Sequence, residues 1–522
     1  MTIYKNRKIN FSKKKQEKVN MTFQLGKEVE KIALQYTRRL ALVINDDKYS
    51  YIELLSEAYR IKTFLEDSEE EFIGIECKNE FFIYAGILGV LLAGKAYVPL
   101  HPELPTARIK SLISQTQLKT ILCADCTNVK LKNYPSTKLV RSEELNCTKN
   151  KTQIAVKKKK NESKIAYVLS TSGSTGEPKL VPISHINLQS FFSFYLKEYI
   201  FKKGDRFLQV YDLNFDVSVF SIFMPWLCGA SCIVPMDGNF KPYEAVKTIQ
   251  KWKVTVTSMV PGMIENLKRY FPEIYLPSLK YSFFSGDALH FATASAWKKC
   301  VPKAEIHNFY GPTETTIVCS RYILKKNNKN QSQTIVPLGK SFPETKISIL
   351  KNKKITFEKN VKGEIMISGP QVFSGYLGNT TKKYFIYHSN EKWYKSGDRG
   401  YIDEKGNLIF LGRIDCQLKV NGYRIEPAEI QNIIFDTVKM KSIVFPSVLN
   451  KNKLICALEL DNVGKNSKYK VLKKEELKKK MNGNLPEYMK LDEIFLFDVF
   501  PENTNGKVDT NKIKSICTNG IV

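Results

Sequence analysis

The stretch YVLSTSGSTGEPKLVP, residues 167–182, places a loop rich in hydroxyl and glycine residues between two apolar runs. Gly173 and Gly176 permit backbone angles that other residues avoid, so neighbouring amide groups can converge on an anion. The Ser and Thr side chains add hydrogen-bond donors, and Lys179 adds a positive charge. The loop therefore predicts a phosphate site between two strands, with a solvated Ser/Gly connector as the alternative. It does not match the P-loop pattern, because Leu180 follows the lysine.

Length and composition indicate a globular chain of more than one domain. The 522 residues exceed what one hydrophobic core usually serves, and 43% hydrophobic with 25% charged residues is typical of soluble proteins. The longest apolar run, residues 81–94, is shorter than the ~20 residues of a membrane span, so no membrane partner is expected. The eleven cysteines are scattered, with Cys123 and Cys126 expected as free thiols, and no secretory signal is visible. A cytoplasmic location is therefore expected.

The formal net charge of +29 bears on possible partners. Nucleic acid is one candidate, but the excess is mostly lysine spread along the chain, and no nucleic-acid-binding motif accompanies it. We therefore expect no nucleic-acid partner. A basic surface also attracts an acidic protein, which is the partner class that the charge favours.

The chain divides into three parts. Residues 1–20 are polar and rich in lysine, so a disordered basic arm is expected. Residues 21–412 alternate short apolar runs, such as FIGIEC at 72–77, with helical patterns, which predicts a large α/β domain of parallel or mixed sheets. Residues 413–522 suffice for a smaller α+β domain.

Polar segments follow several predicted strands. FFSGDAL (283–289), NFYGPTETT (308–316) and YKSGDRGYI (394–402) each carry glycine, hydroxyl and acidic residues after an apolar run. In open α/β sheets, ligands bind beyond the carboxyl ends of the strands. Together with the loop at 167–182, these segments predict a nucleotide site with donors for phosphate, an aromatic ring for a base and acids for ribose and magnesium.

In this order, the segments resemble the core motifs of the adenylate-forming superfamily. Within it, they are similar to stand-alone adenylation domains of nonribosomal peptide synthetases and to D-alanine–carrier protein ligases. LLAGKAYVPLHPELP (91–105), GRIDCQLKVNGYRIE (412–426) and NGKVD (505–509) extend the resemblance over nearly all of residues 25–515. It implies a large N-terminal adenylation core followed by a mobile C-terminal domain.

The resemblance also implies ATP and Mg²⁺ as cofactors. Asn308 is expected to bind the adenine amine, Tyr310 to stack on the ring, Asp398 to bind the ribose hydroxyls and Glu314 to ligate magnesium. Arg413 has an ordinary salt bridge as its alternative. The full set of implied nucleotide-binding residues is Thr171, Ser172, Gly173, Ser174, Thr175, Gly176, Lys179, Asn308, Tyr310, Gly311, Thr313, Asp398 and Arg413.

Catalysis is implied to alternate between two orientations of the small domain. Lys507 matches the lysine that bridges carboxylate and phosphate during adenylation, and Glu314 serves that step through the metal. Asp415 matches the hinge. After rotation, the strand from Lys419 to Gly422 faces the site in place of Lys507 and helps to form a tunnel for a thiol.

Asp216 carries the most information about the substrate. In the family pattern F-D-x-S, this aspartate pairs with the α-amino group of an amino acid, and a buried carboxylate needs such a cation. A helix cap is the alternative. The implied side-chain pocket consists of Val217, Phe220, Ser258, Phe283, Ser285, Phe309, Ile317 and Val318. It contains no charged residue, which favours a small neutral amino acid such as alanine, serine or proline.

The implied reaction has two halves. An amino acid attacks ATP to give an aminoacyl-AMP and pyrophosphate, and the aminoacyl group passes to a phosphopantetheine thiol. No carrier domain follows the last motif, so an acidic carrier protein acting in trans is expected. An acyl-CoA synthetase using coenzyme A and an inactive scaffold homologue are the alternatives.

Overall fold

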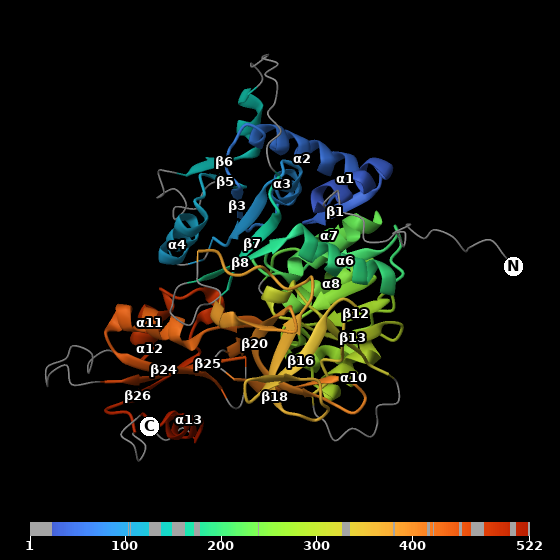
Figure 1. Cartoon of the computed structure of the whole chain (residues 1–522). Coiled ribbons are helices and arrows are strands. Elements are labelled where there is room, and N and C mark those ends of the chain that lie inside the picture. Colours follow the sequence, from blue (N-terminus) through green and yellow to red (C-terminus); the bar gives the residue numbers. More distant parts are fainter. Residues whose placement is uncertain are drawn as a thin grey trace.

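The computed structural model describes residues 23–102, 104, 106–124, 137–148, 162–171, 178–238, 240–325, 335–378, 382–414, 418–420, 422–447, 452–460, 474–501 and 508–519. The expected basic arm at 1–20 lies outside these residues. The described chain forms a large body of three sheets with a smaller body beside it, which is orange to red in Figure 1.

The first sheet carries the strands that flank the glycine-rich loop. Its order is β6-β5-β3-β4-β7-β8, parallel except for the antiparallel pair β7–β8. The strands are β3 Phe72–Glu76, β4 Ala96–Leu100, β5 Thr120–Leu122, β6 Lys138–Val140, β7 Ile165–Thr171 and β8 Lys179–Ser184. Its helices are α2 Tyr51–Leu65, α3 Phe81–Leu92 and α4 Thr106–Thr116. Because α3 is apolar on every side, it is buried along almost its whole length and forms a central layer.

The second sheet has nine strands in the order β15-β14-β13-β12-β11-β9-β10-β1-β2. They are β1 Leu40–Ile44, β2 Asp47–Ser50, β9 Arg206–Leu208, β10 Ser231–Ile233, β11 Val256–Met259, β12 Tyr281–Phe284, β13 Glu305–Tyr310, β14 Ser320–Ile323 and β15 Lys340–Ser341. The pairs that join β13, β12, β11, β9, β10 and β1 are parallel, whereas β2 pairs antiparallel with β1, β14 with β13, and β15 with β14. The carboxyl ends of the parallel strands therefore meet at one edge of the sheet.

Helices join the two sheets. They are α1 Leu25–Gln35, α6 His185–Glu198, α7 Val217–Cys228, α8 Lys241–Trp252, α9 Pro261–Asn266 and α10 Phe291–Cys300. The first of these, α1, packs against α3 of the first layer and α7 of the second. Its first residue, Leu25, donates its backbone N–H to Nδ1 of the buried His185 at 3.2 Å.

The third sheet is antiparallel, in the order β17-β16-β18-β20-β19, with β21 paired to β20. The strands are β16 Lys346–Lys351, β17 Lys354–Thr356, β18 Gly363–Ser368, β19 Phe385–His388, β20 Glu391–Ile402 and β21 Leu408–Arg413. Since β21 ends at Arg413, this residue belongs to the large body.

The smaller body has its own hydrophobic clusters. Its strands are β22 Leu418–Val420, β23 Tyr423–Ile425, β24 Lys441–Pro446, β25 Leu454–Glu459 and β26 Glu493–Phe497. Its helices are α11 Pro427–Val438, α12 Lys474–Asn482 and α13 Thr510–Asn519. In Figure 1, α11 lies below α4 of the first layer, and α13 lies at the opposite end of the smaller body. The predicted α/β class with a smaller α+β part is therefore confirmed.

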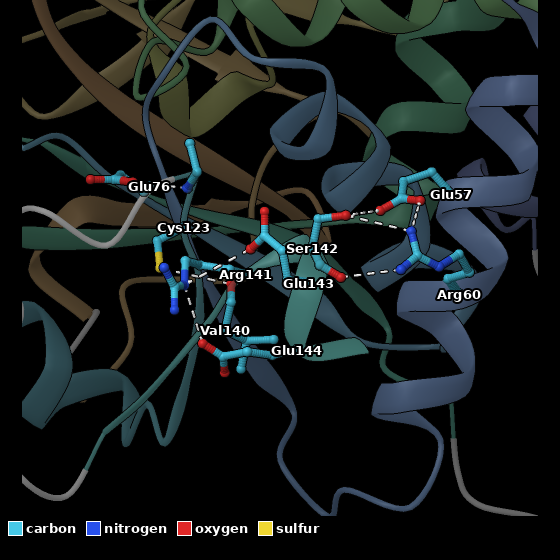
Figure 2. Close-up of polar contacts among 10 residues, drawn as sticks. Glu57, Arg60, Glu76, Cys123, Val140, Arg141, Ser142, Glu143 and Glu144 are labelled. Atoms are coloured by element: carbon cyan, nitrogen blue, oxygen red, sulfur yellow. Dashed lines mark hydrogen bonds and ion pairs between the residues drawn. The ribbon is translucent and has the colours of Figure 1, made fainter. Parts of the chain in front are cut away.

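A polar network fastens the outer edge of the first sheet to α2. Figure 2 shows Ser142 between Glu57 and Arg60: its hydroxyl donates to Glu57 at 2.9 Å, and its carbonyl accepts from Arg60 at 3.1 Å. The backbone N–H of Ala124 donates to Glu76 at 3.1 Å. The Ser142 bonds fix the segment after β6 to α2, and the Ala124 bond fixes the end of β5 to β3.

The structure can be compared with two expectations from composition, which concern membrane spans and free cysteines. Within the described part of the chain, no helix is long and apolar enough to cross a membrane. Seven described cysteines are free thiols. The expectation of a free thiol is wrong for Cys123, which is disulfide-bonded.

His185 predicts a pH-dependent stability. Burial lowers the pKa of His185 to about 4, so the folded protein keeps the neutral ring that accepts from Leu25. The unfolded chain takes up this proton near pH 6.5, so stability falls as the pH drops from about 6.5 to 4, by up to about 3 kcal/mol. The urea unfolding midpoint of His185→Gln should therefore depend less on pH in this window than that of the wild type. The exposed His388→Gln serves as control, and equal pH dependence in all three proteins would contradict the prediction.

Candidate active site

A cavity of about 120 Å³ lies where the carboxyl ends of β12 and β13 meet the start of α7, the end of β21 and the smaller body. It brings together many of the residues predicted from sequence: Thr171, Asp216, Val217, Ser285, Gly311, Thr313, Ile317, Asp398 and Arg413. Its other lining residues are Leu104, Arg108, Leu169, Ser170, Asn214, Phe215, Gly286, Pro312, Gly422, Tyr423 and Tyr488. Of this second group, the sequence singled out only Ser170, as a hydroxyl donor of the loop, and Gly422.

Asp398 is held between two donors. It is 1% exposed, and its Oδ2 accepts from the Tyr310 hydroxyl at 2.6 Å, while its Oδ1 accepts from Arg413 Nη1 at 2.8 Å. Burial and the charge of Asp398 raise the pKa of Tyr310, so Tyr310 stays a donor. The carboxylate thus has a fixed orientation at the edge of the cavity. The ordinary salt bridge considered for Arg413 is present, and both of its members line the cavity.

Asn308 has an acceptor that no described residue uses. Its Nδ2 donates to the carbonyls of Val336 at 3.3 Å and Pro337 at 3.0 Å, which fixes the orientation of the amide. Its Oδ1 is buried and has no hydrogen-bond partner among the described residues. Buried polar atoms are usually paired, so this oxygen suits an N–H donor from a ligand.

Glu314 and Lys179 are connected through Tyr376. Glu314 is fully buried, and its Oε1 accepts from the Tyr376 hydroxyl at 2.7 Å. Lys179 Nζ lies 5.8 Å from the centre of the Tyr376 ring and 5.2 Å from that of Tyr384. Neither tyrosine was predicted as a site residue. Tyr376 lies at the end of the segment FSGYL, but nothing in that segment shows that it contacts a residue 62 positions earlier.

Asp216 lies at the N-terminus of α7 and lines the cavity with Val217. Its side chain makes no capping hydrogen bond to the helix. The helix-cap alternative for this residue is therefore not supported. Ile317 lines the same cavity, and the next residue in the chain, Val318, is buried.

Three predicted pocket phenylalanines, Phe220, Phe283 and Phe309, form a packed aromatic cluster, the aromatic floor, and none of them is among the residues that line the cavity. Phe283 lies 6.0 Å from Phe220 and 5.2 Å from Phe309, measured between ring centres. Tyr195 of α6 contacts all three, at 4.6 Å from Phe220, 5.6 Å from Phe309 and 6.2 Å from Phe283. Sequence reasoning missed Tyr195, because its helix is far from the pocket motifs along the chain. Ser258 is buried beside this floor.

Several predicted residues lie outside the described part of the chain. These are Ser172, Gly173, Ser174, Thr175, Gly176, Asp415 and Lys507. Lys419 is described only as a backbone position in β22. The roles assigned to all of them stay predictions.

The hairpin β22–β23 of the smaller body faces the cavity. Gly422 adopts φ +83° and packs on Val260 so closely that a Cβ would collide with it. The next residue, Tyr423, donates its hydroxyl to Asp212 Oδ2 at 3.1 Å and stacks on Tyr488 with ring centres 4.4 Å apart. The described residues after Lys507, 508–519, line neither this cavity nor the second one described next.

A second cavity of about 630 Å³ adjoins the first. The two share Leu104, Asn214, Tyr423 and Tyr488 as lining residues. The second cavity is also lined by Asn79, His101, Gln209, Val210, Tyr211, Asp212, Pro235, Met236, Asp237, Gly238, Lys241, Pro486 and Glu487. It therefore lies between the two bodies, on the side where the β22–β23 hairpin docks.

A buried ion pair joins the bodies next to the first cavity. Arg108 of α4 pairs with Glu429 of α11, 321 positions later, and their side chains are only 8% and 5% exposed. Charges of this kind are costly to bury without a partner. The pair therefore favours the orientation in which the hairpin faces the cavity.

The α/β protein has two parts, and hydroxyl, acidic and aromatic residues lie together at the ends of its strands. These are features of an enzyme that uses a nucleotide. The chain belongs to the family of AMP-binding enzymes, which matches residues 29–377. The superfamily predicted from the motifs is thus confirmed.

Curated relatives and solved structures agree with this assignment. The chain is 29% identical over 513 residues to the D-alanine–D-alanyl carrier protein ligase of Bacillus cereus (strain AH187), covering 95% of this chain and all of that protein. It is 28% identical over 478 residues to bacitracin synthase 2 of Bacillus licheniformis, but spans only 18% of that protein. The fold is that of the Vibrio cholerae adenylation domain AlmE, with a TM-score of 0.80 at 23% identity, covering 96% of this chain and 99% of AlmE.

The buried ion pair gives a prediction about the docking of the smaller body. Removing one partner of a buried pair typically costs about 3–5 kcal/mol, so Arg108→Ala should release α11 from α4. Hydrogen exchange of the α11 amides should accelerate in Arg108→Ala and in Glu429→Ala. The double exchange Arg108→Glu with Glu429→Arg should restore part of the protection. Unchanged exchange in both single variants would show that the pair does not hold the bodies together.

Proposed function

We propose that the protein is an ATP-dependent, AMP-forming ligase that activates a small neutral amino acid and transfers it to a carrier protein. The observation that carries this proposal is that one cavity contains both nucleotide-type residues, Asp398 and Thr171, and the carboxylate of Asp216. A nucleotide bound against the first group has its phosphates near an amino acid whose ammonium meets Asp216.

The residues present fit ATP. The unpaired Asn308 Oδ1 suits the adenine amine, and Asp398, fixed by Tyr310 and Arg413, offers its carboxylate to ribose hydroxyls. Lys179, at the start of β8, is assigned to the phosphates. Asn308 and Asp398 are already oriented by hydrogen bonds before a ligand binds, which lowers the entropic cost of binding.

The residues also fit Mg²⁺. No group of three or more His, Cys, Asp or Glu side chains in the described part of the chain forms a dedicated metal cage. Magnesium usually takes one or two carboxylates together with phosphate oxygens and waters, and the buried Glu314 supplies such a carboxylate. When bound, the ion offsets negative charge on the phosphates. Tyr376 orients Glu314 for this role through its hydrogen bond.

The charges that develop during the first half-reaction determine which groups the site must supply. The carboxylate oxygen of the amino acid attacks the α-phosphorus of ATP, a P–O bond forms, and pyrophosphate leaves with the electrons of the broken bond. Negative charge accumulates around this centre, so cationic groups must accompany it. Lys507 is assigned to the bridge between carboxylate and phosphate, and Asp216 holds the ammonium so that the attacking oxygen is aligned.

We assign the docked orientation of the smaller body to the second half-reaction. The hairpin β22–β23 covers the cavity, and Lys419 in β22 is assigned to this state. A thiol attacks the acyl carbon of the aminoacyl-AMP, a thioester forms, and AMP leaves while the thiol proton passes to solvent. The partner we propose is an acidic, phosphopantetheinylated carrier protein, attracted by the net charge of +29. The reaction consumes ATP, which agrees with a cytoplasmic location.

The competing functions differ in which of the site residues they require. An acyl-CoA synthetase activates acids without an α-amino group and has no need of Asp216 in the cavity. An inactive scaffold has no need of the paired Asp398, Tyr310 and Arg413. The cavity therefore favours the amino-acid ligase over both alternatives.

Amino-acid-dependent exchange of labelled pyrophosphate into ATP tests the proposal. Exchange should require an amino acid and a divalent cation, and Asp216→Ala should lower kcat/KM by about 10²- to 10³-fold, since a lost buried ion-pair partner costs about 3–5 kcal/mol. The exposed Asp47→Ala is the control. Exchange with simple carboxylic acids but with no amino acid would instead support the acyl-CoA synthetase.

Substitution of Lys507 should affect the two half-reactions differently. Lys507→Ala should lower adenylate formation by about 10²-fold or more, because the transition state loses a cation. Thioester formation from supplied aminoacyl-AMP should stay within about two-fold of wild type, since no described residue near Lys507 lines the cavity in the docked orientation. Lys512→Ala, which removes an exposed lysine of α13, is the matched control. Equal losses in both half-reactions would disprove the alternation.

A further inference from the structure

One side chain of the smaller body, Tyr423, contacts both ends of a turn in the large body. The turn runs from Asp212 to Phe215 and is closed by the Phe215 N–H, which donates to the Asp212 carbonyl at 2.9 Å. The Tyr423 hydroxyl donates to Asp212 Oδ2 at 3.1 Å. The Tyr423 ring meets the Phe215 ring edge to face, with centres 4.5 Å apart and planes at 86°.

The carboxylate of Asp212 is held from the other side by Lys241, the first residue of α8. Lys241 Nζ donates to Oδ1 at 2.8 Å, so Oδ2 is available to Tyr423. Burial acts to raise the pKa of Asp212, but Lys241, His101 and Tyr423 outweigh it and hold this pKa below its usual value. The acceptor of the Tyr423 hydroxyl is therefore a charged carboxylate, which makes a stronger bond than a neutral oxygen does.

The ring of Tyr423 is packed on both sides of the boundary between the bodies. Within the smaller body it stacks on Tyr488, with centres 4.4 Å apart and planes at 9°. On the large body it meets Phe215, and the residue before it, Gly422, lies against Val260. Because the ring is already fixed by these contacts, the hydroxyl loses little further freedom when it bonds to Asp212.

The contacted turn leads directly into the aspartate assigned to the substrate. Asp216 follows Phe215 and stands at the N-terminus of α7. Phe215, Asp216 and Tyr423 line the smaller cavity, and Asp212 and Tyr423 line the larger one. Tyr423 therefore stands where the two cavities adjoin, against the chain segment that carries Asp216.

We propose that Tyr423 and Asp212 form a latch that positions the smaller body for thioester formation and that adenylate formation does not use. The inference rests on the proposed function, which assigns the docked orientation to the second half-reaction. Tyr423 moves with the smaller body and Asp212 belongs to the large one, so rotation of the smaller body breaks their bond. The bond therefore stabilises the docked orientation alone. Tyr423 is a positioning residue, because it acts by placing the hairpin β22–β23.

Tyr423→Phe tests the latch, because it removes the hydroxyl and keeps the ring. The variant is assayed for pyrophosphate exchange and for thioester formation from supplied aminoacyl-AMP, with pantetheine as the thiol and the amino acid that is most active in exchange. Thioester formation should fall about ten-fold more than exchange, since a lost hydrogen bond to a charged group shifts an equilibrium by about that factor or more. Tyr59→Phe is the matched control: it removes a tyrosine hydroxyl that donates to the Glu30 carboxylate at 2.6 Å, within the large body.

Variants of Asp212 show whether the two side chains act as one unit. Asp212→Ala combined with Tyr423→Phe should slow thioester formation no further than Asp212→Ala alone, because both changes remove the same bond. Asp212→Asn keeps an acceptor oxygen for the hydroxyl, so it should retain more of the rate than Asp212→Ala does.

Hydrogen exchange of the ligand-free proteins measures the latch without any activity. Amides in residues 211–217 and 422–425 should exchange faster in Tyr423→Phe and Asp212→Ala than in the wild type, because the docked orientation is less populated. The same segments should exchange at the wild-type rate in Tyr59→Phe.

The outcomes separate the latch from the proposed function. Equal losses in both half-reactions, or thioester formation and hydrogen exchange at wild-type rates in Tyr423→Phe, would overturn the inference while amino-acid activation stands. If no amino acid supports pyrophosphate exchange, the proposed function falls, and the role of the latch in thioester formation falls with it. Faster hydrogen exchange in Tyr423→Phe would then still show that this bond holds the two bodies together.

Discussion

The site depends on one buried carboxylate, Asp398, at the point where two sheets and the chain leading to the smaller body meet. It accepts from Tyr310 at the end of β13 in the nine-stranded sheet and from Arg413 at the end of β21 in the antiparallel sheet. A buried carboxylate is tolerated only when donors surround it. These two bonds therefore fix the antiparallel sheet against the parallel one and place Arg413, two residues before the predicted hinge Asp415, at the rim of the cavity.

The same constraint keeps the nucleotide site independent of the orientation of the smaller body, as the proposed alternation requires. Asp398, Tyr310 and Arg413 all belong to the large body, so the groups proposed for adenine and ribose do not move with the hairpin β22–β23. The hairpin is positioned by separate contacts, chiefly Arg108 with Glu429 and Tyr423 with Asp212. In the docked state, the cavity is closed by Gly422 and Tyr423.

Much of this arrangement could be predicted from local sequence patterns. The alternation of apolar runs and helical segments gives the α/β class, and polar residues after β12, β13 and within β20 identify the edge of the sheet where Ser285, Gly311 and Asp398 converge. Gly422 was expected to face the site. Its positive φ and its packing against Val260 now give a physical reason for glycine at that position.

The remaining features arise from contacts between distant parts of the chain, which local patterns do not encode. Nothing around Arg108 indicates a partner 321 positions away, and the ring of Tyr195 meets the pocket only because α6 packs beneath the sheet. The roles of Lys507, Lys419 and Asp415 stay predictions.

The central claim is that a carboxylate oxygen of an amino acid attacks the α-phosphorus of ATP. The most direct measurement uses an amino acid labelled with ¹⁸O in both carboxylate oxygens, with the aminoacyl-AMP discharged onto a small thiol and the products analysed by mass spectrometry. The account predicts one ¹⁸O atom in AMP and none in pyrophosphate, because the bridging oxygen leaves with AMP when the thiol attacks the acyl carbon. Label in pyrophosphate or in free phosphate, or ADP as the product, would contradict it.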